Sequence, residues 1–195
     1  MNFTKKFDFE TILDTHTLIY GETDTKKTFF TAKFVKFLLE TKNIPPKEIS
    51  ILDFAPKLAY VKNLKIGGRI QDYYDNSMEC NYIKFEGEII PPRLNAHNKK
   101  EMYYNICLNF NKIYKILEIY NKNPTSVLIV NDISLYLHLG NIKYLINTIN
   151  KSNTFFGNAY YGKSISTKFS KLMTLKEKKR VEFLIKNIEN SFKTS

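Results

Sequence analysis

Short, almost uninterrupted apolar runs recur along the chain and are separated by longer segments with helical spacing. Each run is bounded by Gly, Pro, Asn or Asp, which is typical of buried β-strands. On this basis, strands are predicted at residues 15–20, 49–54, 126–130 and 153–159. Strands that are apolar on both faces are characteristic of a parallel sheet covered by helices.

Helices are predicted between and after these strands. From Asn98 to about residue 120, apolar residues step by three and four positions, and Asn98 with Glu101 forms a capping-box pattern. Thr174 with Glu177 repeats that pattern near the end of the chain. The predicted helices span residues 27–42, 98–120, 137–150 and 174–192.

The alternation of strands and helices predicts an α/β fold, a three-layer sandwich built on a mainly parallel sheet. Parallel neighbours need long crossovers, whose fixed hand places all strand C-termini on one edge of the sheet. Ligands of such proteins bind at that edge. Gly21, Asp53, Asp132 and Asn158 end the predicted strands or lie close to their ends, so we expect them to cluster there.

A chain of 195 residues suits one domain, so residues 1–195 are interpreted as a single folded unit. Two parts depart from the regular alternation. Residues at about 57–97 lack a consistent period and are predicted to be an irregular insertion with one hairpin. Residues at about 163–195 are interpreted as a basic, helical C-terminal segment.

Composition narrows the class of protein. Hydrophobic residues make up 43% of the chain and charged residues 25%, which are globular proportions. No apolar run approaches the roughly 18 to 20 residues that span a bilayer. The start of the chain, MNFTKKFDFETILD, lacks the apolar core of a secretory signal. We therefore expect a soluble, cytoplasmic protein with no membrane partner.

The cysteines and histidines do not form a recognisable site. Cys80 and Cys107 are far apart and match neither a disulfide framework nor a C-x-x-C pair. His16, His97 and His138 are also scattered. The sequence predicts no zinc site.

The net charge of +11 favours polyanionic partners such as nucleic acid, although a coding bias toward Lys, Asn and Ile produces the same excess. The basic residues are concentrated between positions 163 and 193, where few acidic residues accompany them. They are Lys163, Lys168, Lys171, Lys176, Lys178, Lys179, Arg180, Lys186 and Lys193. We expect this segment to contact nucleic acid, the alternative being an ordinary solvated helix face.

The stretch LIYGETDTKKTFF carries the one chemical pattern above background. It matches a phosphate-binding loop, G-x-x-x-x-G-K followed by Ser or Thr, except that Lys26 replaces the second glycine. A predicted strand precedes it and a predicted helix follows it, as such a loop requires. Backbone N–H groups and the helix N-terminus would then supply positive charge to phosphate oxygens.

On these residues the chain resembles the P-loop NTPases, over most of residues 15–160. GETDTKKT would be the Walker A loop and LIVND the Walker B strand. In the RecA-like branch, the Walker B strand is third and the fourth strand ends in a polar sensor, as predicted here near Asn158. The segments IPPRLNA, PTSVLIVND and GNAYYG are also similar to uncharacterised archaeal P-loop proteins.

The resemblance implies binding of ATP or another NTP together with Mg²⁺. The loop residues that would surround the phosphates are Gly21, Glu22, Thr23, Asp24, Thr25, Lys26, Lys27 and Thr28. Lys27 would be the lysine that reaches the terminal phosphates, and Thr28 would supply the magnesium-binding hydroxyl.

Three polar residues beyond the loop complete the implied site. Asp132 is favoured as the Walker B carboxylate on the metal side and as a catalytic residue; Asn158 would sense the terminal phosphate. In a second register Asn131 takes the Walker B place, and Asp132 falls where a catalytic Glu stands. Asp53 would contact Mg²⁺ or orient the attacking water, or it would merely begin a turn.

Two further residues affect the strength and type of activity. The glycine before the P-loop lysine adopts a positive φ, which costs a residue such as Lys26 on the order of 1 kcal/mol. That penalty corresponds to about tenfold in affinity. Arg93 is the best candidate for a phosphate-contacting arginine outside the loop, since a guanidinium binds phosphate through two donors.

Three functions remain open. The favoured one is a nucleotide-binding protein with weak or partner-dependent ATPase activity, with nucleic acid as a candidate partner. A non-catalytic pseudo-ATPase that binds nucleic acid, a protein partner or a second copy is the first alternative. A phosphotransferase is the other, with the 57–97 insertion and Arg93 forming the acceptor site.

Overall fold

The computed structural model describes residues 8–61, 64–85 and 87–194. Its main sheet has six strands in the order β5-β2-β6-β7-β1-β8, and every pairing between neighbours is parallel. The strands are β1 (His16–Gly21), β2 (Ile49–Asp53), β5 (Asn81–Ile83), β6 (Val127–Asn131), β7 (Thr154–Tyr160) and β8 (Asn190–Lys193). The predicted α/β fold with a mainly parallel sheet is confirmed.

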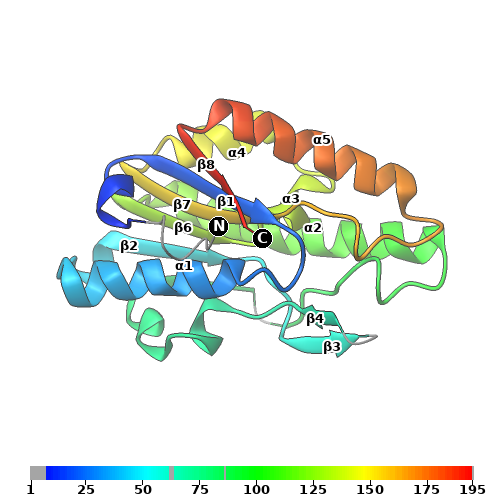
Figure 1. The fold of residues 1–195 in the computed structure, drawn as a ribbon, viewed down its shortest axis with the longest axis horizontal. Coiled ribbons are helices and arrows are strands. Elements are labelled where there is room, and N and C mark those ends of the chain that lie inside the picture. Colours follow the sequence, from blue (N-terminus) through cyan, green and yellow to red (C-terminus); the bar gives the residue numbers. More distant parts are fainter. Residues whose placement is uncertain (1–7, 62–63, 86, 195) are drawn as a thin grey trace.

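Helices cover both faces of this sheet (Figure 1). They are α1 (Lys27–Lys36), α2 (Lys99–Lys122), α3 (Ile133–Leu137), α4 (Ile142–Ile149) and α5 (Lys171–Asn187). One core packs α1 against the sheet, and the other packs α2 to α5 against the opposite face. Alternate β6 side chains enter the two cores, because successive residues of a strand point to opposite faces. The result is a three-layer sandwich.

The insertion contains the predicted hairpin and also adds to the main sheet. β3 (Ala59–Val61) and β4 (Leu64–Ile66) pair antiparallel, and residues 62–63 between them lie outside the described residues. β5 pairs in parallel with β2 and forms one edge of the six-stranded sheet. The segment shows no clear hydrophobic period because its strands, β3, β4 and β5, are too short to produce one.

The helix predicted at residues 137–150 begins too early, because residues 138–141 form a turn between two helices. α3 ends at Leu137 and α4 begins at Ile142. A Cβ at Gly140 would lie 2.3 Å from the Tyr136 ring, so the chain turns there on a residue without a side chain. The side chain of Asn141 then caps α4 by accepting a hydrogen bond from Lys143 N at 2.9 Å.

The C-terminal helix differs from the prediction at both ends. α5 starts after Ser170, and Thr174 N donates to Ser170 O at 2.9 Å, so Thr174 lies inside the helix and does not cap it. The helix ends at Asn187, and β8 then pairs with β1. This pairing satisfies backbone groups along the outer edge of β1, an effect that local periodicity does not reveal.

The two ends of the chain bear on other predictions. Residues 1–7, half of the segment in which no secretory signal is expected, lie outside the described residues. Among the helices of the described ranges, none combines the length and apolar character needed to cross a bilayer.

Candidate functional site

A cavity of about 340 Å³ opens at the carboxyl edge of the sheet. Its walls come from the loop after β1, the β3–β4 hairpin, residues 91–94, the ends of β6 and β7, and α5. The predicted residues that line it are Thr23, Asp24, Thr25, Lys26, Lys27, Thr28, Arg93, Asp132 and Asn158. Gly21, Glu22 and Asp53 are not among the lining residues.

The loop of residues 21–28 contains two residues other than glycine in the left-handed backbone conformation. Lys26 adopts φ 59° and ψ 19°, the left-handed conformation that favours glycine, and α1 begins at the next residue. Asp24 also has a positive φ, of 56°. Left-handed geometry costs an L-residue roughly 1–2 kcal/mol, so this loop carries strain at two positions.

Contacts from distant parts of the chain hold the 21–28 loop in place. Thr25 Oγ1 lies 2.6 Å from Thr194 Oγ1, just beyond β8, and also donates to Glu22 O at 2.8 Å. A Cβ on Gly21 would stand 2.3 Å from Thr194 Oγ1, which explains the glycine at this position. Thr23 Oγ1 donates to Lys65 O of β4 at 3.0 Å. These contacts offset part of the backbone strain.

The Lys27 ammonium lies within this loop. It donates to Glu22 O and, at 3.3 Å, to Thr25 Oγ1. Burial lowers the pKa of Lys27 to about 8, and the negative charges of Asp132, Glu22 and Asp24 oppose that decrease. Lys27 is thus a partly desolvated cation facing the cavity, held by acceptors that a phosphate group would replace.

Buried amides join the ends of the central strands beneath the loop. Thr28 Oγ1 donates to Asn131 Oδ1 at 3.3 Å, and Asn158 Nδ2 donates to the same oxygen at 2.8 Å. Asn131 Nδ2 donates to Asp53 Oδ1 at 2.9 Å. Asn131, and not Asp132, therefore stands against the Thr28 hydroxyl. Of the two residues between which the sequence leaves the choice open, the neutral amide is the one that contacts Thr28.

Asp53 lies behind the cavity wall. Its carboxylate accepts hydrogen bonds from the backbone N–H of Ala55 and Ile70 at 3.1 and 2.9 Å, from the Tyr82 hydroxyl and from Asn131. Burial raises the pKa of Asp53, and these hydrogen bonds limit the rise. Because its oxygens are already occupied, Asp53 positions Asn131 and the insertion in this structure.

Asp132 lines the cavity at the start of α3. It has φ 58°, and its backbone N–H donates to Asn158 Oδ1 at 3.0 Å. Its carboxylate accepts a hydrogen bond from the Ser134 hydroxyl. Burial raises the pKa of Asp132, while that hydrogen bond and the charge of Lys27 lower it. A strained backbone and a partly desolvated carboxylate together are typical of functional positions.

Glu22 has a structural partner outside the cavity. Its carboxylate accepts hydrogen bonds from the backbone N–H of Lys163 at 2.5 Å and from Ser164 Oγ at 2.5 Å. Partial burial opposes ionisation, but the hydrogen bonds from Ser164 and Lys163 outweigh it and lower the pKa of Glu22. Glu22 thus joins the 21–28 loop to the segment after β7.

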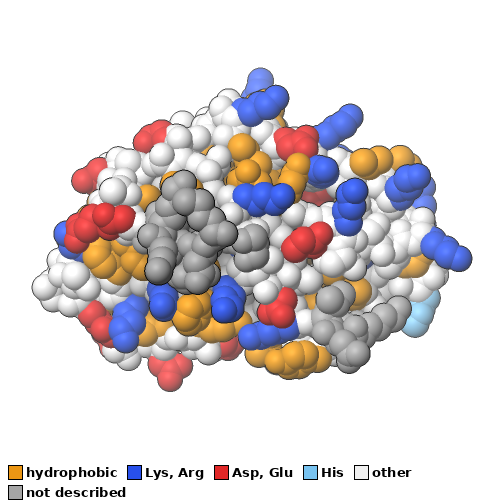
Figure 2. Space-filling view, viewed as in Figure 1, with side chains coloured by type: hydrophobic (Ala, Val, Ile, Leu, Met, Phe, Trp, Pro, Cys, Tyr) orange, Lys and Arg blue, Asp and Glu red, His pale blue; other side chains and the backbone are white. Residues whose placement is uncertain are grey.

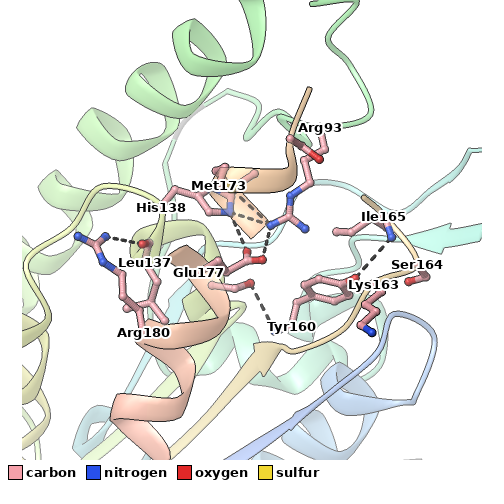
Figure 3. Close-up of polar contacts among 12 residues, drawn as sticks. Arg93, Leu137, His138, Tyr160, Lys163, Ser164, Ile165, Met173, Glu177 and Arg180 are labelled. Atoms are coloured by element: carbon pink, nitrogen blue, oxygen red, sulfur yellow. Dashed lines mark hydrogen bonds and ion pairs between the residues drawn. The ribbon is translucent and has the colours of Figure 1, made fainter. Parts of the chain in front are cut away.

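Arg93, which belongs to the insertion, lines the cavity and contacts two residues, Glu177 and His138, that the sequence pattern does not indicate (Figure 3). The guanidinium is 2% exposed, and its Nη2 donates to Glu177 Oε2. His138 Nε2 lies 2.8 Å from Glu177 Oε1. The sequence places Glu177 in a capping box; it faces the cavity instead, because α5 begins three residues earlier than predicted.

Mg²⁺, which the resemblance implies, has a partial ligand set in this chain. Thr28 lines the cavity and supplies a hydroxyl oxygen, a ligand type that Mg²⁺ prefers. Asn131 Oδ1 is buried outside the lining and already accepts hydrogen bonds from Thr28 and Asn158. Among the described residues, no three His, Cys, Asp or Glu side chains gather into a metal-binding group. Of the adjacent pair Thr28 and Asn131, Thr28 alone would reach a magnesium ion in the cavity, and the other ligands of that ion would have to come from phosphate groups and water.

Replacing Lys26 with glycine is expected to raise the free energy of unfolding by about 1 kcal/mol, because glycine adopts a positive φ at lower cost. Nucleotide affinity should rise by up to about tenfold, since backbone N–H groups can then approach phosphate more closely. Chemical denaturation and ATP–Mg²⁺ titration measure the two effects. Negligible and equal ATP binding by both proteins would contradict the phosphate-loop assignment.

Asn43→Gly is the matched control for this prediction. Asn43 also has a positive φ, of 52°, and does not line the cavity. Its replacement should change stability in the same direction and leave nucleotide affinity unchanged. A gain in affinity for Asn43→Gly would show that the effect of Lys26→Gly is not local to the loop.

Comparisons with known proteins add little to this geometry. A scan against known protein families finds no match, and a search of curated proteins finds none either. Among solved structures, the chain is similar to one in "Structure of Drosophila ORC bound to GC-rich DNA and Cdc6". The TM-score is 0.29 and the identity 14%, over 95% of this chain and 52% of that chain, so this chain spans about half of its neighbour. A likeness at this level carries no assignment.

Proposed function

We propose that the protein binds a nucleoside triphosphate, ATP being the first candidate, and hydrolyses it slowly. One observation carries this proposal: Lys27 and Thr28 of the loop and the carboxylate of Asp132 line the same cavity at the carboxyl edge of a parallel sheet. A phosphate-binding loop, a desolvated lysine and an acid are the groups that phosphoryl chemistry requires.

In the proposed complex, the phosphates lie against the backbone N–H groups of the 21–28 loop and the N-terminus of α1. The Lys27 ammonium leaves Glu22 O and Thr25 Oγ1 for oxygens of the terminal phosphates. Mg²⁺, bound through Thr28, would neutralise charge on the phosphates. Asp132 orients the attacking water and accepts its proton, which is the role of a general base.

Slow turnover follows from two departures from the usual site. Strain at Lys26 weakens the grip of the loop on phosphate, and Asn131 supplies no charge to the metal. Asp132 retains the acidic group needed for water attack. Calorimetric titration with Mg²⁺ and a nonhydrolysable ATP analogue tests binding: one site per chain is expected, and no heat of binding at millimolar analogue would overturn the proposal.

Phosphoryl transfer to another acceptor is a second candidate, favoured because Arg93, His138 and Glu177 line the same cavity as Lys27 and Asp132. An acceptor hydroxyl there would replace water as the nucleophile. Following labelled γ-phosphate separates the two reactions: transfer places the label on the acceptor, and hydrolysis releases it as inorganic phosphate.

The proposed function includes contact with nucleic acid through α5. On the face shown in Figure 2, basic side chains are frequent over the region that α5 occupies in Figure 1. The exposed lysines of the helix are Lys171, Lys176, Lys179 and Lys186. Arg180, by contrast, donates to Leu137 O, and Lys178 lies 5.1 Å from the Tyr161 ring centroid.

Changing the four exposed α5 lysines to glutamine is expected to weaken binding of single-stranded DNA at low salt. For every lysine that neutralises a phosphate, its replacement should lower the salt dependence of binding by about 0.7 in the log–log slope. The matched control changes the four exposed lysines of α2, which are Lys99, Lys100, Lys115 and Lys122. Equal weakening in both variants, measured by fluorescence anisotropy, would contradict a specific role for α5.

A further inference from the structure

The inner end of the cavity contains an arginine whose donors are only partly used. Arg93 Nη2 contacts Glu177 Oε2 and lies 3.5 Å from Met173 Sδ. Arg93 Nε and Nη1 are buried and have no hydrogen-bond partner among the described residues. His138 Nδ1, on the neighbouring ring, is also buried without a partner in the described part of the chain. Three polar nitrogens are thus unsatisfied at one place.

A purely structural ion pair does not account for this arrangement. An arginine that only neutralises a carboxylate can present two parallel donors to it, whereas Arg93 contacts Glu177 through one nitrogen. Each buried donor left unpaired costs about 1–3 kcal/mol. The Tyr160 ring, whose centroid is 5.4 Å from Arg93 Cζ, packs against the guanidinium without supplying an acceptor for these donors.

The unused N–H donors of Arg93 favour an oxygen ligand. Burial by itself raises the pKa of Glu177, but the charge of Arg93 and the hydrogen bond with His138 outweigh it, so the pKa is lowered. Glu177 is therefore ionised and neutralises Arg93. Nε–H and Nη1 do not share an edge of the guanidinium, because Cδ lies between them, but each shares an edge with Nη2. A carboxylate or phosphate group would therefore be held by one of these unused nitrogens together with the second N–H of Nη2.

This group of residues shares the cavity with Lys27 and Asp132. All five residues, Arg93, His138, Glu177, Asp132 and Lys27, line the same cavity. The charge of Lys27 lowers the pKa of Asp132 and the charge of Glu177 raises it, so both groups lie within electrostatic range of its carboxylate. A molecule held at Arg93 would thus lie next to the acid that we assign to the chemistry at Lys27.

We propose that Arg93, with His138, forms a second subsite that binds the carboxylate or phosphate group of a small molecule alongside the nucleotide. The position of this subsite rests on the proposed function, because it is defined relative to a nucleotide bound at Lys27. Two ligand classes share the required chemistry, namely a carboxylate and a phosphate monoester. Such an anionic substrate would bring its own hydroxyl group close to Asp132.

Calorimetry on the protein saturated with Mg²⁺ and a nonhydrolysable ATP analogue tests the subsite. Inorganic phosphate and malonate are the two probes, and the tighter of them identifies the ligand class. We expect one anion to bind per chain. Absence of binding by both probes, or anion binding that displaces the analogue, would overturn the proposal.

Substitutions at Arg93 test whether the anion binds to this residue. Arg93→Met combined with Glu177→Gln removes the cation without leaving a buried carboxylate unpaired, and should weaken anion binding by about tenfold or more. Arg93→Lys keeps the charge but loses the paired donors, and should also weaken binding. Arg180→Met is the matched control, because Arg180 lies on α5 outside the cavity lining. Unchanged anion affinity in a folded Arg93 variant would contradict the assignment.

The result of the anion-binding test can be distinguished from the result of the nucleotide-binding test. If the analogue does not bind, the nucleotide proposal fails, and the probes are then titrated against Lys27→Met protein without nucleotide. Anion binding there that is lost on adding Arg93→Lys would still establish the subsite. Anion binding that survives in that double variant would place the anion elsewhere and reject the subsite.

Discussion

Lys27→Met is expected to weaken binding of ATP–Mg²⁺ by about a hundredfold or more, equivalent to ~2.7 kcal/mol. Charge-assisted hydrogen bonds from a desolvated ammonium to phosphate are among the strongest contacts available to the loop. The fold should persist, because Lys27 Nζ donates only to Glu22 O and Thr25 Oγ1 among the described residues, both within the same loop. Calorimetric titration measures the affinity, and thermal unfolding measures the stability.

The affinity of the native protein should also fall as the pH rises above about 8. The pKa of Lys27 in the free protein is about 8, and bound phosphate favours the charged form, so it raises that pKa. Binding above this pH therefore requires uptake of a proton, and affinity decreases with pH. Lys27→Met should abolish this dependence.

Lys36→Met is the control for both effects. Lys36 is an exposed residue of α1 that forms an ion pair with Glu40 and does not line the cavity. Its replacement should leave ATP affinity and its pH dependence intact. If Lys27→Met binds ATP as tightly as the native protein, the phosphate-binding role of the loop lysine is wrong.

Asp132→Asn is expected to reduce phosphate release or transfer by about a hundredfold or more, the usual contribution of a general base. Binding of the nonhydrolysable analogue should change only a few-fold, because an asparagine oxygen can still accept the hydrogen bond from Ser134. Stability should increase at neutral pH. A buried carboxylate is costly, and burial is the largest contribution to the raised pKa of Asp132.

The stability gain of Asp132→Asn should grow with pH. Because the folded-state pKa of Asp132 is raised, the folded native protein binds its proton more tightly than the unfolded chain does. This tighter proton binding adds to the free energy of unfolding. The added stability is complete below the pKa of Asp132 in the unfolded chain, about 3.9, and is lost as the pH rises through its pKa in the folded protein. The asparagine variant has no such loss, so the two stability curves should diverge across this range.

Measurement of labelled phosphate and denaturant unfolding at several pH values checks this prediction. Asp14→Asn is the matched control, since Asp14 is an exposed carboxylate that also has a positive φ, of 54°, and does not line the cavity. It should leave turnover almost unchanged. If Asp132→Asn turns over ATP at the rate of the native protein, Asp132 is not the general base. The interpretation in which Asp132 occupies the place of a catalytic Glu would then be wrong.

Local sequence patterns are sufficient to predict the four inner strands of the sheet and its carboxyl edge, but not the two outer strands, β5 and β8. The apolar runs are strands within one or two residues because they are short, buried and flanked by turn residues. β1, β2 and β6 end at Gly21, Asp53 and Asn131, and Asn158 lies inside β7, so the expected residues lie at or near one edge. The positive φ at Lys26 also follows from its place in the motif.

The remaining parts of the site depend on contacts between distant residues. Arg93 and Glu177 are separated by 84 positions, and no local pattern links them to each other or to His138. Asn131 and Asp132 are the two candidates for the Walker B place, and the distinction between them depends on which side chain faces Thr28. The register of the strand, which the local sequence does not show, determines this. Thr194 reaches the 21–28 loop only because β8 joins the sheet beside β1.

A structure of the protein with Mg²⁺ and a nonhydrolysable ATP analogue would show whether the 21–28 loop binds phosphate. We expect phosphate density against the backbone N–H groups of residues 21–28, with Lys27 Nζ moved from Glu22 O to a phosphate oxygen. The Asp132 carboxylate should lie beside the terminal phosphate. An empty loop at saturating analogue, or a nucleotide bound elsewhere on the protein, would contradict the assignment of this loop.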